Sequence, residues 1–269
     1  MKITLFYNRS IHENAAYYYQ LSKEAREKLA GVDKAIEDSR KELESSEKVE
    51  KKHVRVVRQK EWFERYHSAK TTGNLLMIGG RNAQQNDQLV SKYMDETDLF
   101  FHADIQGGTV VILKIKGALE HGEIGEGGGR AIEPDEQDFA EAAQFAASFS
   151  NAWKNGNASV DVYAVSKNQL TKNVSGGFVP SGAFAILGER KWFRNTKLAL
   201  RIGISKEDGR IRVVPDVAKI HLKDELVVVP SLSGKEKGAL AKSLAKRFNI
   251  HPDELLEILP NGKSKTIQG

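Results

Sequence analysis

Two polar clusters, each placed directly after a short apolar run, hold the side chains best suited to chemistry. One follows Gly79-Gly80 and is made of forked hydrogen-bonding groups: Arg81, Gln84, Gln85 and Asn86. The other follows Phe101 and comprises His102, Asp104 and Gln106. Glycine lets a backbone approach a ligand closely, and guanidinium and amide groups match phosphates and base edges. Backbone amides at a helix start after Arg81 would also face an anion. The clusters predict a polar binding surface on a sheet.

A third stretch interleaves positive charge with an aromatic ring: Arg190, Lys191, Trp192 and Arg194. Such a set can clamp backbone phosphates and stack a base, and stacking contributes about 1–3 kcal/mol per base. The alternative is an edge strand of the core in which Trp192 and Phe193 are flanked by solubilising charges. Lys167 is likewise either a phosphate contact or an ordinary surface lysine.

Catalytic and metal chemistry have less support. His102 and Asp104 alternate along a strand and would point to one face, but a metal site usually needs three or four ligands. A further ligand could come from the acidic loop of residues 117–133, which makes a metal-assisted nucleic-acid-processing enzyme one rival hypothesis. Ser166 and Lys167 are adjacent on a strand, so they face opposite sides and cannot act together. We expect no catalytic residue, no metal and no cofactor.

The elements that position these residues begin with a helical arm. Apolar residues recur every seven positions in two rows, one of Tyr18, Ala25 and Val32 and the other of Leu29, Ile36 and Leu43. This seam predicts helix over residues 12–70, with a break at Ser45-Ser46 that makes an antiparallel hairpin projecting from a globular body. The alternative is two helices folded flat on the body. An exposed seam would also permit self-association.

The pattern changes after Gly73 to short runs of β-branched and aromatic residues, typical of strands. We expect strands at residues 75–78, 99–101, 109–115, 160–165, 183–187, 198–204, 211–214 and 225–229, with a hairpin turn at 206–209. Helices are expected at residues 83–94 and from Pro134, where proline and acids open the first turn. The glycine-rich, acidic residues 117–133 are expected to be a mobile loop. A phosphate cradle is the alternative, but no Gly-Lys-Ser/Thr follows Gly127–Gly129. The fold class is α/β (α+β) with a mixed sheet.

The last segment, residues 231–269, has the pattern of two short helices. Leu240, Leu244 and Phe248 mark the apolar side of the first, and Pro252-Asp-Glu opens the second. Basic side chains would lie outward on them: Lys235, Lys237, Lys242, Lys246 and Arg247. The predicted domains are therefore an arm of residues 1–70, a mixed α/β domain of residues 71–230 and a basic lobe of residues 231–269, either docked as a cap or independent.

Composition and charge fit a cytoplasmic protein that binds nucleic acid. The chain of 269 residues has no cysteine and a net charge of +5, and no apolar run approaches the roughly 20 residues of a membrane helix. Charge is uneven, with eight Lys/Arg against three Glu over residues 48–70 and five basic against twelve acidic residues over 71–140. Local basic faces beside an acidic one favour nucleic acid over indiscriminate polyanion binding, although chance clustering is the alternative.

Several stretches in register resemble the NFACT family, which includes nuclear export mediator factor and fibronectin-binding-protein-A-like factors of ribosome-associated quality control. Besides the two opening clusters, they are Ser150–Trp153, Ala164–Lys167 and Gly182–Lys191. Ser10–Tyr19 resembles the start of the family's coiled-coil arm, and Ile258–Lys263 the tail of its archaeal-type members. The resemblance covers nearly the whole chain.

The resemblance implies a non-enzymatic RNA-binding module, with tRNA or large-subunit ribosomal RNA as partner. Family members bind the large ribosomal subunit carrying a stalled nascent chain and recruit tRNA to extend it. The signature positions matched here are Arg81, Gln85, Asn86, His102, Asp104, Lys167, Arg190 and Lys191. The family's large N-terminal domain has no counterpart in this chain, so we expect a fragment or a stand-alone protein of arm and RNA-binding domain. A scaffold that binds proteins through its arm and acidic face is the remaining alternative.

The chain also departs from the family pattern. Asn82 stands where an aspartate is usual, Gln106 where a histidine is usual, and Ser68-Ala69 replaces a Trp-Phe pair. The arm is short. Any role that needs a paired histidine is therefore in question.

Overall fold

The computed structural model describes residues 3–8, 10–46, 60–115, 133–174 and 177–267. The chain divides into two compact units, residues 1–54 and residues 55–269. No helix in the described part of the chain has the length and apolar content needed to cross a membrane. The glycine-rich loop expected at residues 117–133 lies almost wholly outside the described residues.

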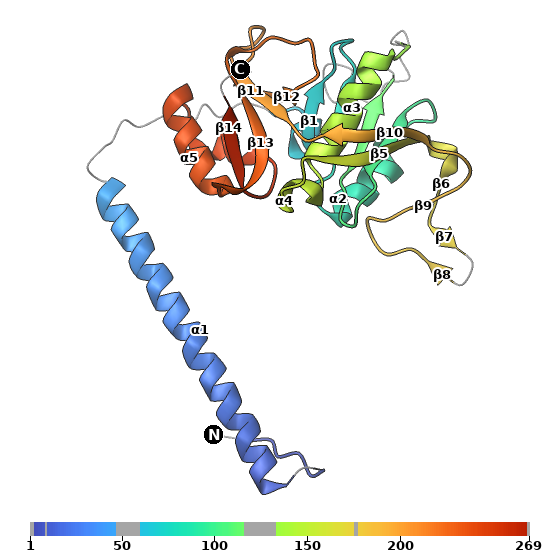
Figure 1. Cartoon of the computed structure of the whole chain (residues 1–269). Helices are drawn as coiled ribbons and strands as arrows, with labels where there is room; N and C mark the ends of the chain where they lie inside the picture. The colour runs from blue at the N-terminus through green and yellow to red at the C-terminus, as the bar shows by residue number, and fades with distance from the viewer. Residues whose placement is uncertain (1–2, 9, 47–59, 116–132, 175–176, 268–269) are drawn as a thin grey trace. The chain divides into compact units, whose positions relative to one another are not determined.

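The first unit is built on one long helix, α1 (Ile11–Ser46) (Figure 1). It begins with a capping box: the Glu13 amide donates to the Ser10 hydroxyl, and the Ser10 amide donates to the Glu13 carboxylate at 2.7 Å. The first helix of the expected arm is confirmed. Leu29, Val32 and Ile36 of its seam are each more than half exposed. Self-association through this seam stays a prediction.

The prediction of a second arm helix is wrong for residues 60–70. Most of the remainder of that predicted helix, residues 47–59, lies outside the described residues. Residues 60–70 contain a 3-10 turn, Trp62–Arg65, and strand β1 (His67–Lys70). β1 pairs with β2 (Leu76–Gly79) in a hairpin, with Asn74 at φ 64° in the connection. The sequence of residues 60–70 alone could not reveal this strand, because its conformation depends on pairing with β2, which lies outside that segment.

The second unit is centred on a six-stranded sheet of order β1-β2-β4-β3-β5-β10 (Figure 1). Its other strands are β3 (Leu99–Ala103), β4 (Val110–Lys114), β5 (Ser159–Ser166) and β10 (Lys191–Lys197). The predicted α/β (α+β) class is confirmed by the combination of helices and sheets. Every strand pairing in this sheet is antiparallel, so the sheet is not mixed in strand direction. β10 is an edge strand, as the alternative interpretation of Trp192-Phe193 described.

Helices cover both faces of this sheet. α3 (Glu136–Ser148), the helix expected from Pro134, begins with a capping box between Asp135 and Asp138 and buries a face rich in alanine. α4 (Asn151–Lys154) follows it. On the other face, α2 (Ala83–Gln88) continues as a π-helical turn, Leu89–Tyr93, which packs on Phe100 and Ile112.

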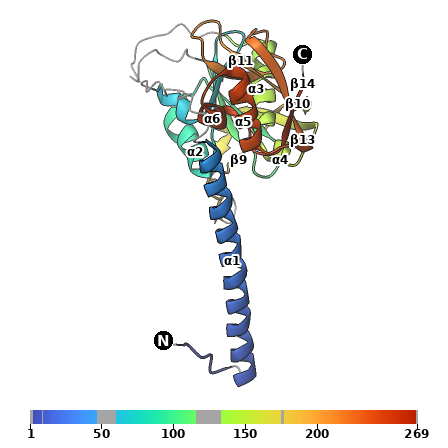
Figure 2. The same ribbon diagram turned by 90° about the vertical axis from the view of Figure 1, so that its left-hand side faces the viewer.

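A second, four-stranded sheet has the order β12-β11-β13-β14. Its strands are β11 (Leu200–Ile204), β12 (Ile211–Pro215), β13 (Lys223–Lys235) and β14 (Ser264–Ile267). The expected β11–β12 hairpin is confirmed; β14 was not expected, and β13 runs through the boundary predicted at 230/231. Helices α5 (Lys237–Phe248) and α6 (Pro252–Ile258) lie side by side (Figure 2) and share a hydrophobic core with α3.

Residues 170–187 form a narrow extension of short paired strands. β6 (Leu170–Thr171) pairs with β9 (Ala185–Ile186), and β7 (Asn173–Val174) with β8 (Gly177–Phe178). Asp87 of α2 holds the extension: it accepts hydrogen bonds from the Ser181 hydroxyl and the Gly182 amide, and it pairs with Lys172 at 2.5 Å. Gly182 has φ 78°, and a Cβ there would lie 2.5 Å from Ala83 Cα. This close approach places the extension beside the site.

Candidate nucleic-acid interface

Strands β3, β5 and β10 carry a row of aromatic rings on the side of the sheet away from α3. The register pairs His102 with Tyr163 and Tyr163 with Trp192. Because side chains alternate along a strand, Asp104 and Arg190 project on the same side as this row. Their neighbours Phe101 and Phe193 instead join the core beneath α3. We call this surface the aromatic face, made of His102, Asp104, Asp161, Tyr163, Arg190, Trp192 and Arg194.

Two guanidinium groups lie against the Trp192 ring. Arg194 Cζ is 3.9 Å from the ring centroid and Arg190 Cζ is 5.7 Å from it. Arg190 Cζ is also 4.6 Å from the centroid of Tyr163, whose ring meets Trp192 edge-on at 5.5 Å. Cation–π contacts of this kind hold guanidinium groups in place. Aromatic rings and guanidinium planes are the two surfaces on which unpaired nucleobases stack.

The two arginines differ in their charge environment. Arg194 pairs with Asp161 at 2.6 Å. The Asn195 amide, at 2.7 Å, and the Arg194 guanidinium together lower the pKa of the Asp161 carboxyl. Among the described residues, no carboxylate lies within ion-pair distance of Arg190. Arg190 is therefore the cation of this face that is available to an anion.

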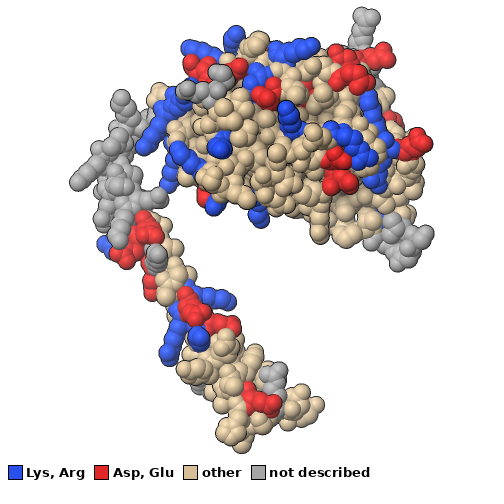
Figure 3. All heavy atoms as spheres, viewed as in Figure 1, with Lys and Arg blue, Asp and Glu red and all other residues tan. Residues whose placement is uncertain are grey.

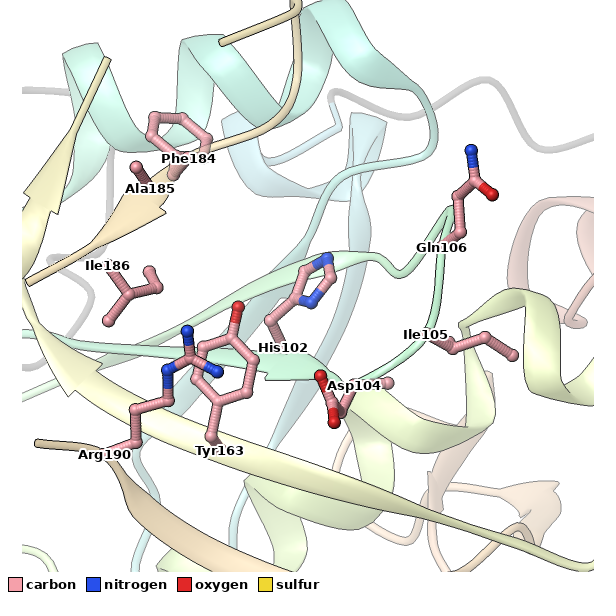
Figure 4. Close-up of a pocket in the computed structure, with 10 residues that line it drawn as sticks. His102, Asp104, Ile105, Gln106, Tyr163, Phe184, Ala185, Ile186 and Arg190 are labelled. Carbon is pink, nitrogen blue, oxygen red and sulfur yellow. The ribbon is translucent and has the colours of Figure 1, made fainter. Parts of the chain in front are cut away.

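A pocket of about 480 Å³ opens on the aromatic face (Figure 4). His102, Tyr163 and Arg190 lie on one side of it, and Phe184, Ala185 and Ile186 of the extension face them from the other. Asp104, Ile105 and Gln106 complete the lining. The pocket thus combines an apolar wall, aromatic rings and charged groups of both signs.

His102 and Tyr163 are the two polar rings of the pocket, and both are largely enclosed. Burial lowers the pKa of the His102 imidazole, although hydrogen bonds with the backbone of Gly108 and Ala103 act in the opposite direction. A Cβ on Gly108 would lie 2.6 Å from His102 Cε1, so glycine is needed there to admit the ring. Burial also raises the pKa of Tyr163. Both rings are therefore uncharged at neutral pH, and Arg190 and Asp104 carry the charge of the pocket.

The first polar cluster does not join this face. Arg81 donates to the Tyr66 and Glu64 carbonyls at 3.0 and 3.4 Å, and burial lowers the pKa of its guanidinium. Asn86 is buried and contacts the Val110 amide and the Gly182 carbonyl. Gln85 bonds the Arg81 amide and, weakly, the Arg65 carbonyl. Arg81 and Gln85 thus hold the backbone of residues 64–66, next to β1, whereas Asn86 joins the start of β4 to the extension.

Three further predicted residues lie elsewhere. Lys191 points to the α3 side, where its Nζ pairs with Glu136 at 2.9 Å and lies 3.9 Å from the Phe139 centroid. Lys167, in the turn after β5, pairs with Glu96 at 3.1 Å. Gln84 is exposed on the first turn of α2. Of the predicted RNA-binding residues, His102, Asp104, Arg190, Trp192 and Arg194 gather on the aromatic face, and the others lie away from it.

His67, beside Arg81, is expected to make stability depend on pH. Burial, with Arg81 and Lys237 nearby, holds its pKa well below the ordinary value of 6.5. Below that value the unfolded chain takes up a proton that the folded chain refuses, so the free energy of unfolding falls as pH drops, by up to about 1.4 kcal/mol per unit. Denaturant unfolding at pH 7.5 and 5.5 should show a smaller fall for His67→Gln. The exposed His221→Gln should match the unchanged protein, and equal falls in all three would contradict the assignment.

Tyr163, Phe184 and Ile186 line the pocket but were not predicted from the sequence as site residues. Tyr163 lay within an expected strand. Because residues two apart on a strand share a face, its spacing from Asp161 was the signal that both side chains project on the same side of the sheet. Phe184 and Ile186 read as an ordinary strand, since nothing local shows that the extension folds back over β3. For metals, the described residues contain no group of three or more His, Asp or Glu that could hold an ion.

Comparison with known proteins identifies the domain that carries most of this face. Residues 61–188 match the family described as NFACT protein RNA binding domain, NFACT-R. This stretch belongs to the NFACT family. The NFACT-R match includes β1 to β5 and the extension, and therefore His102, Asp104 and Tyr163. β10, with Trp192 and Arg194, follows directly after the matched residues.

Curated relatives agree with this assignment. The archaeal Rqc2 homolog aRqcH of Methanocaldococcus jannaschii is 33% identical over 223 residues, which cover 81% of this chain and 31% of that protein. The ribosome quality control complex subunit NEMF homolog of Drosophila melanogaster is 30% identical, covering 71% and 18%. The Rqc2 homolog RqcH of Bacillus subtilis is 27% identical, covering 64% and 32%. The chain spans about a third or less of the length of these relatives.

Proposed function

We propose that this chain is an RNA-binding module of a ribosome quality-control factor, and that the aromatic face is where RNA is held. The partners are tRNA, large-subunit ribosomal RNA or both, on a large subunit with a stalled nascent chain. The NFACT-R match and the names of the relatives support the RNA and ribosome part of the proposal. The role is binding rather than catalysis.

One observation carries the assignment to this face: Arg190, which has no carboxylate partner in the described part of the chain, lies against both Tyr163 and Trp192. A phosphate can bind the guanidinium while a neighbouring base stacks on the exposed parts of these groups. A second basic surface supports the same function. Lys and Arg side chains gather on the surface around α5 (Figure 3), where the helix carries the exposed residues Lys242, Lys246 and Arg247. That surface suits phosphate contacts without base recognition.

Salt dependence tests the proposed function directly. Phosphate contacts release counterions, so RNA affinity should fall more than tenfold between about 50 and 200 mM salt. Filter binding of the chain to tRNA and to ribosomal RNA at the two salt concentrations measures this. No association at the lower salt would refute RNA binding. An affinity that does not change with salt would refute the phosphate-based mode.

The alternatives have separate signatures. A metal-assisted enzyme would bind a divalent ion and lose nuclease or transfer activity in His102→Ala. A protein scaffold would capture one non-ribosomal protein as the main species in a pulldown. The described residues offer no metal cluster in favour of the first, and the exposed seam of α1 is the feature that bears on the second.

A further inference from the structure

Resting on the RNA-binding function proposed above, we propose that the pocket of the aromatic face is a subsite for a single unstacked nucleotide whose base carries an exocyclic amino group. Adenine, cytosine and guanine qualify, and uracil does not. The subsite would thus give the module a preference among unpaired bases.

The size and lining of the pocket suit one nucleotide. Its volume of about 480 Å³ falls within the range of roughly 300–1,000 Å³ typical of small-ligand sites. Phe184 and Ile186 form an apolar wall opposite the rings of His102 and Tyr163 (Figure 4). A planar base inserted between these walls would contact apolar or aromatic groups on both faces. Its edge would then meet the polar groups of the lining.

The two charged groups of the pocket do not neutralise each other by forming an ion pair. Arg190 and Asp104 lie on either side of the Tyr163 ring (Figure 4), and no ion pair joins them. Among the described residues, the Asp104 carboxylate has no salt-bridge or hydrogen-bond partner, and only the backbone of Asp104 is bonded, to the Asp161 carbonyl at 2.7 Å. Gln106 is exposed beside it, with its backbone carbonyl bonded to Asn151 at 3.1 Å. Arg190 is therefore able to bind an anion, and the Asp104 carboxylate is able to accept hydrogen bonds from a group that donates them.

The chemistry of these groups assigns their roles. The Arg190 guanidinium binds the phosphate of the nucleotide, because it is the positive group of the pocket. An ionised carboxylate only accepts hydrogen bonds, so Asp104 selects a base edge that donates. The amino groups of cytosine, adenine and guanine donate, whereas the donor of uracil, its N3–H, is flanked by two carbonyl oxygens, one of them where cytosine has its amino group. A carbonyl facing Asp104 would be repelled.

Fluorescence anisotropy with labelled single-stranded eight-residue RNAs of A, C or U tests the subsite. The full chain should bind the A or C oligonucleotide about tenfold more tightly than the U oligonucleotide. Asp104→Asn should bring this ratio close to one, because an amide can donate to the uracil carbonyl. Glu207→Gln is the matched control: it removes the same charge from an exposed position in the β11–β12 turn. The control should keep the ratio.

The outcomes separate this proposal from the one it rests on. Binding of every oligonucleotide with no preference, or a preference that survives Asp104→Asn, would overturn the subsite while leaving RNA binding intact. A ratio that changes as much in Glu207→Gln would show a general charge effect and also overturn it. No binding of any oligonucleotide would also overturn the subsite, whereas the RNA-binding function itself is overturned only if tRNA and ribosomal RNA fail to bind at the lower salt concentration.

Discussion

Arg190→Glu is expected to weaken the binding of single-stranded RNA at least tenfold at low salt. The substitution removes the cation of the aromatic face for which the described residues offer no carboxylate partner, and it places a negative group against Tyr163 and Trp192. The loss of one phosphate contact should also reduce the slope of log affinity against log salt by about 1. Anisotropy titrations over several salt concentrations measure both quantities.

Lys206→Glu is the control for that substitution. It changes the net charge by the same amount at an exposed position in the β11–β12 turn. Its affinity should fall only slightly, through the weak long-range effect of net charge. Equal losses in the two variants would mean that total charge, and not the aromatic face, governs binding. Unchanged affinity in Arg190→Glu would place the RNA elsewhere.

Trp153→Ala is expected to lower the free energy of unfolding by about 3–5 kcal/mol. The Trp153 side chain is fully buried, and its Nε1 donates to the Ser264 hydroxyl at 2.9 Å. It therefore joins α4 to β14, elements far apart in the sequence. The substitution leaves a cavity in the core and removes this connection. Chemical denaturation monitored by circular dichroism measures the change.

Two comparisons sharpen the tryptophan prediction. Ser264→Ala leaves the buried indole N–H without its acceptor and should cost about 1–3 kcal/mol. Trp192→Ala, at a half-buried position on the edge strand, should cost less stability than Trp153→Ala but weaken RNA binding. A larger stability loss in Trp192→Ala than in Trp153→Ala would mean that the roles of the two tryptophans are reversed.

Much of the body could be predicted from sequence because its signals are local. The alanine face of α3, the β11–β12 hairpin and the burial of Trp153 follow from periodicity and turn residues. The first helix of the arm follows from its heptads. In each case a residue's neighbours in the chain determine its environment.

The composition of the site depended on tertiary structure. The sequence by itself determined which residues are chemically able to bind RNA: arginines, tryptophan, histidine and aspartate at matched positions. It could not determine that Arg81 is used to hold Tyr66 and Glu64, or that Lys191 faces α3 while Arg190 faces the pocket. Those outcomes depend on strand order and on the edge position of β10, which are set by pairings between distant segments. Tyr163, Phe184 and Ile186 enter the site for the same reason, because folding brings the extension over β3.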